Sequence, residues 1–208
     1  MPELFKLLNS PKPPKPMTGV ILSGGKSLRM GEDKAFLKIG GMPIIERTIL
    51  LLQELFEETI VITNQRKHYQ HLGLNVFDDL IPNLGALGGL YTGIERSSYP
   101  YSFVVACDMP FLNRKVIELL TEQTGDFDVI IPKTEDGLQP LHAIYSKGCL
   151  SAILQVLKEK KNRIIDIFPL VRVNVIDEKR FLSLDPNRLS FVNLNTPEDL
   201  LFLRNIMV

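Results

Sequence analysis

The sequence predicts an α/β fold, namely a three-layer, Rossmann-like sandwich built on a mixed, mostly parallel β-sheet. Short and almost wholly apolar strands such as residues 102–107 indicate burial on both faces of the sheet, as in parallel sheets. Strand and helix patterns alternate from residue 18 to 130, which implies right-handed crossovers between parallel strands. The less regular order after residue 130 predicts at least one antiparallel strand.

The elements of the first half follow in order. An apolar strand over 19–22 runs into a Ser-Gly-Gly turn, and Pro43 opens a helix with one apolar side. We expect further strands over 59–63, 74–77 and 102–107, and a short helix over 66–72. A long loop that contains Pro82 and several glycines is expected over 78–89, followed by a helix to about residue 97.

In the second half, Asn113 is expected to cap a helix over 114–124. Strands are predicted over 127–132 and 140–145, with a polar turn over 133–137 between them. Helices over 148–159 and 163–168 precede an alternating edge strand over 170–176. A strand over 191–195 and a last helix, capped by Thr196 and running to about residue 206, complete the chain.

Composition excludes several classes of protein. The 208 residues include 24 Lys and Arg and 24 Asp and Glu, so the chain lacks the basic excess of proteins that bind nucleic acid or anionic lipid. No apolar run approaches the 18 residues or so of a membrane span. Two cysteines without a CxxC pair fit a reducing cytosol, so we expect a cytoplasmic protein.

The first segment with unusual chemistry is the glycine-rich exit of the first strand, residues 23–34. Glycines let backbone N–H groups approach an anion closely, and Arg29 and Lys34 add two cations in the same stretch. The spacing matches neither a Walker P-loop nor a dinucleotide fingerprint. We therefore expect a phosphate-binding loop of another kind.

Two more acidic segments are expected at the same edge of the sheet. Asp108 directly follows the apolar strand 102–107, where a carboxylate beside a triphosphate would need a divalent cation such as Mg²⁺ between them. Asp78 or Asp79, in the loop after strand 74–77, could accept hydrogen bonds from the N1–H and N2–H₂ edge of guanine. Asn64 follows the second strand and either lines the same rim or forms a turn.

These residues, in this order, resemble the nucleotidyltransferase superfamily with the signature GG-x-S-x-RMG-x-DK. The resemblance is strongest to the molybdenum cofactor guanylyltransferase family. The stretches DLIPNLGALGGL, CDMPF, QPLHAIY and FVNLNTPEDL support it, and together the motifs span residues 18–200. Ser23 stands where the family commonly has Ala, and Ala86 where it commonly has Pro.

The resemblance implies a nucleotidyltransferase fold and assigns roles to individual residues. Arg29, Lys34 and Asp108 would be catalytic, and Asp108 would ligate Mg²⁺. The nucleotide would contact eight residues, namely Leu22, Ser23, Gly24, Gly25, Lys34, Asn64, Asp79 and Asp108. Asp79 is preferred over Asp78, although the variable length of the loop leaves both open. The acceptor would contact Gly85, Gln139, Asn193 and Asn195.

The implied domain organisation is a mobile, proline-rich lead over 1–16 and one domain over 17–208. Within that domain, residues 17–112 would bind the nucleotide and residues 113–208 the acceptor. The implied reaction transfers GMP from GTP to the terminal phosphate of molybdenum-bound molybdopterin and releases pyrophosphate. We expect a monomer, to which other cofactor-biosynthesis proteins could deliver the pterin.

Two other functions stay open at this point. One is a sister transferase, such as a cytidylyltransferase, that acts on another phosphate acceptor. The second is a nucleotide-binding module without catalytic activity, which would bind GTP but release no pyrophosphate.

Overall fold

The structure is a computed structural model, and it describes residues 14–24, 34–194 and 199. An eight-stranded sheet in this part of the chain has the order β10-β7-β9-β6-β1-β4-β5, and β8 pairs with β7 off this path. The strands are β1 (Lys15–Leu22), β4 (Phe56–Ile62), β5 (Asn75–Phe77), β6 (Tyr101–Ala106), β7 (Val129–Thr134), β8 (Gly137–Leu138), β9 (His142–Ser146) and β10 (Val173–Asp177).

The sheet is mixed, as predicted. Strands β5, β4, β1 and β6 are parallel to one another, β9 is antiparallel to both β6 and β7, and the edge strand β10 is parallel to β7. A short antiparallel hairpin of β2 (Lys38–Ile39) and β3 (Met42–Pro43) lies outside this sheet.

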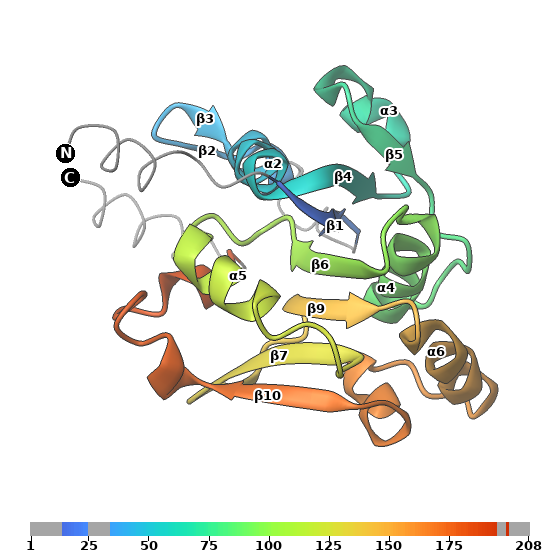
Figure 1. Cartoon of the computed structure of the whole chain (residues 1–208). Helices are drawn as coiled ribbons and strands as arrows, with labels where there is room; N and C mark the ends of the chain where they lie inside the picture. The colour runs from blue at the N-terminus through green and yellow to red at the C-terminus, as the bar shows by residue number, and fades with distance from the viewer. Residues whose placement is uncertain (1–13, 25–33, 195–198, 200–208) are drawn as a thin grey trace.

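Helices cover both faces of the sheet and complete the three layers (Figure 1). The helices α2 (Ile44–Leu55) and α5 (Arg114–Thr121) pack on one face, and α4 (Gly85–Arg96) and α6 (Cys149–Lys158) pack on the other. Side chains alternate along β1 accordingly: Ile21 joins the α2 side of the core, and Val20 and Leu22 join the α4 side. Both faces are therefore apolar, which explains why the parallel strands read as continuous apolar runs.

Shorter helical segments connect these elements. They are α3 (Arg66–Tyr69) and the 3₁₀ turns η2 (Lys34–Phe36), η3 (Gln70–Leu72), η4 (Ile164–Leu170), η5 (Glu178–Arg180) and η6 (Leu189–Phe191). The predicted cap of α5 is confirmed, because the Asn113 side chain accepts hydrogen bonds from the backbone N–H groups of Lys115 and Val116.

Several predicted boundaries were wrong. Helix α4 already begins at Gly85, so the loop after β5 is shorter than the 78–89 predicted from its glycines. Residues 192–194 form no strand, because the chain makes a 3₁₀ turn over Leu189–Phe191 and then continues irregularly. Strand β1 begins at Lys15, inside the segment expected to be a mobile lead. The predicted last helix over 197–206 lies almost wholly outside the described residues.

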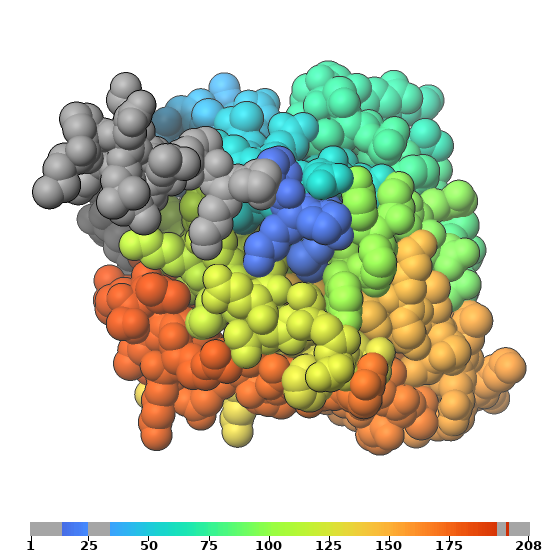
Figure 2. Space-filling model, viewed as in Figure 1, coloured from blue at the N-terminus to red at the C-terminus, as the bar shows by residue number. Residues whose placement is uncertain are grey.

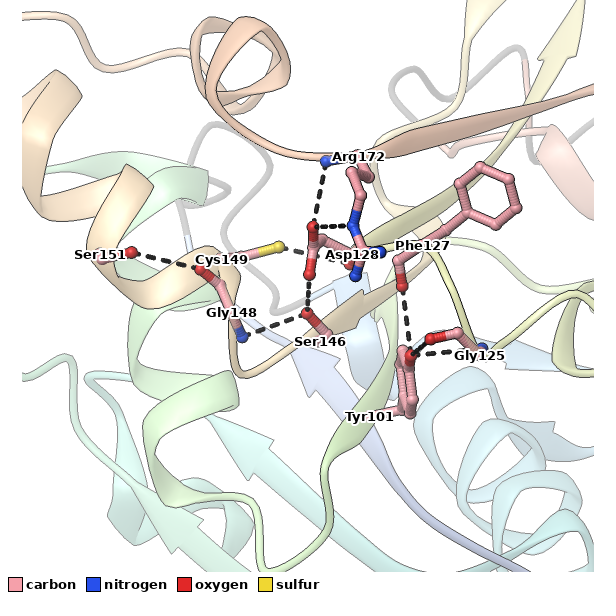
Figure 3. A network of polar contacts seen from close by, with 9 residues as sticks. All are labelled: Tyr101, Gly125, Phe127, Asp128, Ser146, Gly148, Cys149, Ser151 and Arg172. Carbon is pink, nitrogen blue, oxygen red and sulfur yellow. Dashed lines mark hydrogen bonds and ion pairs between the residues drawn. The ribbon is translucent and has the colours of Figure 1, made fainter.

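A polar network joins strands β7, β9 and β10 (Figure 3). The Asp128 carboxylate, just before β7, accepts hydrogen bonds from the Ser146 hydroxyl (3.0 Å) and the Arg172 backbone N–H (3.0 Å). Burial would raise the pKa of Asp128, but the hydrogen bonds from Arg172 and Ser146 outweigh it and lower the pKa below its usual range. Gly148 belongs to this cluster because a Cβ there would lie 2.8 Å from an Asp128 oxygen.

Candidate functional site

The topology identifies one end of the sheet as the place for a ligand. The chain leaves β1 through α2 on one face, and it enters β6, on the other side of β1, through α4 on the opposite face. Such a switch point opens a crevice at the carboxyl ends of the two strands. The two ends are adjacent, because the Cys107 backbone N–H donates to the Leu22 carbonyl at 3.0 Å.

Lys34 and Asp108 meet at this crevice, although 74 positions separate them in the sequence. The Lys34 ammonium is close enough to act electrostatically on the Asp108 carboxylate. Both residues also contact Leu194. Lys34 Nζ donates to the Leu194 carbonyl at 2.8 Å, and the Leu194 backbone N–H donates to the Asp108 carbonyl at 2.9 Å. The segment before Asn195 therefore bridges the end of β6 and the residue that closes the glycine-rich loop.

The Asp108 carboxyl group is half-buried. Burial raises its pKa, and the positive charge of Lys34 partly opposes that shift. A half-buried acid of this kind is stabilised in its charged form by any further cation that binds beside it. The group is consequently suited to hold a cation at the mouth of the crevice.

A second polar pair lies on the α4 side of the same edge. The Asn64 side-chain amide donates to the Asp79 carboxylate at 2.9 Å, and the Asp79 backbone N–H donates to the Asn64 side-chain oxygen at 3.0 Å. Asp78 instead forms an exposed ion pair with Arg66 at 3.7 Å. The Asp79 carboxylate is thus oriented by Asn64, whereas Asp78 points to a surface cation.

The end of β1 presents two different faces to this site. Leu22 packs toward α4, where the position of a Cβ on Gly89 would lie 3.4 Å from Leu22 and 3.7 Å from an Asp79 oxygen. Ser23 is buried on the opposite face, and its hydroxyl contacts Tyr69 and Cys107. Gly24 is exposed, and a Cβ there would meet no atom of the described residues within 4 Å.

The other predicted site residues divide into three groups. Asn193 is exposed and directly precedes the Leu194 bridge. Gln139 precedes β9 and donates through Nε2 to the Thr134 hydroxyl at 2.9 Å, while Gly85 opens α4 with φ +57°. Gly25, Arg29 and Asn195 lie outside the described residues.

Sequence reasoning missed two residues that the structure brings into this region. Leu194 lies within the predicted strand 191–195, but in the structure it is buried with Ile39 and Ile44 while its backbone contacts Lys34 and Asp108. Tyr69 lies in the predicted short helix, and in the structure it is fully buried with its hydroxyl bonded to that of Ser23. The only local signal was a large aromatic residue in an otherwise polar helix.

The donor set limits how a metal could bind. Within residues 14–24, 34–194 and 199, no group of three or more His, Cys, Asp or Glu side chains is arranged to hold a metal ion. A single carboxylate such as Asp108 fits Mg²⁺, which protein sites often bind through one or two carboxylates while substrate phosphates and water complete the octahedron.

A small surface hollow lies at the opposite end of β1, between the ends of α2 and α5, and is lined by Lys15, Glu54, Leu55, Phe56, Arg114, Glu118 and Thr121. The blue start of β1 lies beside the yellow-green α5 in the space-filling view (Figure 2), and Lys15 donates to the Thr121 hydroxyl. The hollow is therefore separate from the crevice at Asp108. No helix in the described part of the chain is both long and apolar enough to cross a membrane.

Comparison with known proteins identifies a family and its fold. Residues 19–170 match the model of the MobA-like NTP transferase domain. A relative from Pelotomaculum thermopropionicum, named a probable molybdenum cofactor guanylyltransferase, is 41% identical over 187 residues, which cover 90% of this chain and 91% of the relative. The molybdenum cofactor guanylyltransferase of Desulfosudis oleivorans is 34% identical, over 88% of this chain and 92% of its own length.

Solved structures share the architecture. The molybdopterin-guanine dinucleotide biosynthesis protein A of Archaeoglobus fulgidus superposes with a TM-score of 0.78 at 24% identity, over 92% of this chain and 98% of that one. The 4-diphosphocytidyl-2C-methyl-D-erythritol synthase of Anaerococcus prevotii superposes with a TM-score of 0.69 at 14% identity, over 93% and 96% of the two chains. At these identities the likeness establishes the nucleotidyltransferase fold.

Proposed function

Because the chain belongs to the MobA-like NTP transferase family, we propose that it transfers GMP from GTP to the terminal phosphate of molybdenum-bound molybdopterin. The product is the molybdopterin guanine dinucleotide cofactor, and pyrophosphate is released. The observation that carries this proposal is the meeting of Lys34, Asp108 and the end of β1 at the switch point of the sheet. The names of the relatives supply the choice of GTP and molybdopterin.

The reaction needs little chemistry from the protein. An oxygen of the acceptor phosphate attacks the α-phosphorus of GTP, and the bond from that phosphorus to the oxygen that bridges it to the β-phosphorus breaks. Pyrophosphate leaves with the electron pair of that bond. Since a phosphate is already ionised at neutral pH, no general base is required, and catalysis consists of positioning and of stabilising negative charge.

The nucleotide would lie along the carboxyl end of β1. The backbone of Leu22, Ser23 and Gly24, with Gly25, would approach the phosphates. Gly24 suits this role because it is exposed, and because packing against the described residues does not require a glycine there: a Cβ would meet none of their atoms within 4 Å. Lys34 would offset the charge that builds on pyrophosphate, and the resemblance gives Arg29 the same task.

The guanine base would lie on the α4 side of β1. The Asp79 carboxylate, oriented by two hydrogen bonds with Asn64, can accept hydrogen bonds from the N1–H and N2–H₂ groups of guanine. Cytosine and uracil lack that pair of adjacent donors, so this arrangement favours GTP over CTP and UTP.

Asp108 would hold Mg²⁺, and its half-buried carboxylate fits a single-carboxylate site of the kind that phosphate oxygens complete. When bound, the ion would neutralise charge on the nucleotide phosphates. The acceptor would contact Gly85, Gln139, Asn193 and Asn195. Of these, Asn193 directly precedes Leu194, whose backbone is hydrogen-bonded to Asp108.

The test is to incubate the protein with molybdopterin, Mg²⁺ and each of GTP, CTP, UTP and ATP, and to identify products by mass spectrometry. We expect the guanine dinucleotide and pyrophosphate from GTP alone. Asp108→Asn should lower the rate by at least about a hundredfold, the usual scale for losing one charge-stabilising group. Asp126→Asn, an exposed acid just before Asp128, is the matched control and should retain full activity.

Two results would overturn the proposal. A product from CTP alone would identify a sister cytidylyltransferase, and GTP binding without pyrophosphate release under any acceptor would identify a nucleotide-binding module. If Asp108→Asn retained the wild-type rate, Asp108 would not belong to the site.

A further inference from the structure

Tyr69 is a fully buried tyrosine that lies beneath the candidate site without facing it. Its hydroxyl is hydrogen-bonded to the Ser23 hydroxyl, and the Ser23 hydroxyl also donates to the Cys107 sulfur at 3.2 Å. Ser23 precedes the exposed Gly24 at the end of β1, and Cys107 precedes Asp108 at the end of β6. The Tyr69 and Ser23 hydroxyls therefore connect the ends of β1 and β6, directly before Gly24 and Asp108.

The ring of Tyr69 makes a third connection. It packs against Phe36 with ring centroids 5.1 Å apart and planes inclined by 52°. Phe36 ends the 3₁₀ turn that begins at Lys34. Tyr69 thus contacts both Ser23, which begins the glycine-rich segment, and the turn η2, which follows that segment. Tyr69 itself belongs to a separate helix, α3, between β4 and β5.

We propose that Tyr69 is a positioning residue for nucleotide binding, because it holds Ser23 and Phe36 directly and Cys107 through Ser23. These three contacts keep Gly24, Lys34 and Asp108 at the mutual distances that a triphosphate requires. This inference rests on the proposed function, since it assumes that those three residues bind the nucleotide. Tyr69 acts through its neighbours and does not touch the substrate.

The two parts of the side chain can be separated by substitution. Tyr69→Phe removes the hydroxyl and keeps the ring against Phe36, so the core packing is preserved. Ser23→Ala removes the other partner of the same hydrogen bond. If the hydrogen bond itself positions Ser23, the double variant should bind GTP no more weakly than either single variant. Each single change already breaks the bond, so the second change has no further effect on it.

Two measurements test the proposal. The first is calorimetric titration with GTP and Mg²⁺, at a temperature where every variant is folded. We expect Tyr69→Phe to bind GTP about fivefold more weakly or worse, as a loss of about 1 kcal/mol would produce. Tyr101→Phe is the matched control, because the Tyr101 hydroxyl is also hydrogen-bonded but lies at the opposite end of β6 (Figure 3).

The second measurement needs no nucleotide. A thiol reagent, 5,5′-dithiobis(2-nitrobenzoate), should label partly exposed Cys107 several-fold faster in Tyr69→Phe than in the wild type, while buried Cys149 stays unlabelled in both. Faster labelling supports the positioning role even if the wild type binds no GTP, a result that would refute only the proposed function. If neither the labelling rate nor the GTP affinity changes, Tyr69 only fills the core and the inference is wrong.

Discussion

At the scale of single residues, the site depends on a carboxylate and an ammonium group, and both residues also hydrogen-bond to the backbone of Leu194. Asp108 is half-buried with a raised pKa, and Lys34 donates to the Leu194 carbonyl. The glycine-rich segment between Ser23 and Lys34 supplies the phosphate contacts in our proposal, and both of its described flanks touch Tyr69 directly or through Phe36. Residues outside the site therefore determine how its charged groups are placed.

Another residue with unusual surroundings is His142 on β9. It is fully buried. Its ring packs edge-on against Phe103, with ring centroids 5.1 Å apart, and is inclined by 59° to Phe191, with centroids 4.8 Å apart. Among the described residues neither ring nitrogen has a hydrogen-bond partner of good geometry. Burial lowers the pKa of His142 to about 3, and the charge of Asp185 only partly opposes this shift.

This burial predicts how stability depends on pH. Between pH 6.5 and about pH 3 the unfolded chain binds a proton that the folded protein excludes, so the stability linked to His142 is complete above pH 6.5 and is lost as the pH falls. From pH 7 to pH 5 the wild type should lose about 2 kcal/mol more unfolding free energy than His142→Phe. Urea unfolding of both proteins at the two pH values would measure the difference. Equal losses would mean that His142 takes up its proton in the folded protein over the same pH range as in the unfolded chain.

At the scale of elements, the glycines of α4 explain the boundary that was predicted wrongly. A Cβ on Gly88 would lie 3.0 Å from the Ile81 carbonyl oxygen, and one on Gly93 would lie 2.6 Å from a methyl carbon of Val20. These glycines bring the helix close to the sheet and to the preceding loop. Glycine is usually a signal for a turn, but here two of these glycines serve close packing inside a helix.

Gly93→Ala tests this explanation. Alanine favours a helix over glycine by about 1 kcal/mol, whereas overpacking a core costs typically 1–3 kcal/mol. Because the new methyl group would overlap buried Val20, we expect a net destabilisation of up to about 2 kcal/mol in urea unfolding. In a Val20→Ala background, where the space is open, the same change should be neutral or stabilising. The same loss in both backgrounds would disprove the packing explanation.

At the scale of the whole molecule, the two ends of the sheet have different tasks. The candidate site lies at the carboxyl ends of β1 and β6, and the network around Asp128 lies before β7 and after β9, where β6 begins. That network fastens β7, β9 and β10, which flank the parallel part of the sheet (Figure 3). Stability and binding can therefore be changed separately.

Asp128→Ala should show this separation. It removes the acceptor for the Ser146 hydroxyl and for the Arg172 backbone and guanidinium, so we expect a loss of about 1–3 kcal/mol of unfolding free energy. GTP affinity, measured well below the unfolding transition, should stay at the wild-type value. Asp126→Ala, an exposed acid two positions away, should change neither quantity. A matching loss of GTP affinity would show that the two ends are coupled.

The order of elements and their types could be predicted from local patterns, because apolar runs, helical spacing and cap residues reflect forces that act within a few residues of each other. The strand over 102–107, the helix after Pro43 and the cap at Asn113 follow from such patterns, and the structure confirms them. The glycine-rich segment and the two acids after β5 and β6 also stand out locally, so the candidate site could be located along the chain.

The remaining features depend on contacts between segments far apart in the chain. Leu194 reaches Lys34 and Asp108, Tyr69 reaches Ser23, and Asn64 orients Asp79 rather than Asp78. No local pattern encodes these contacts, because each depends on the order of the strands within the sheet and on the twist of the sheet. Sequence patterns could therefore identify the chemical groups of the site, whereas their mutual orientation follows from the packing of the complete fold.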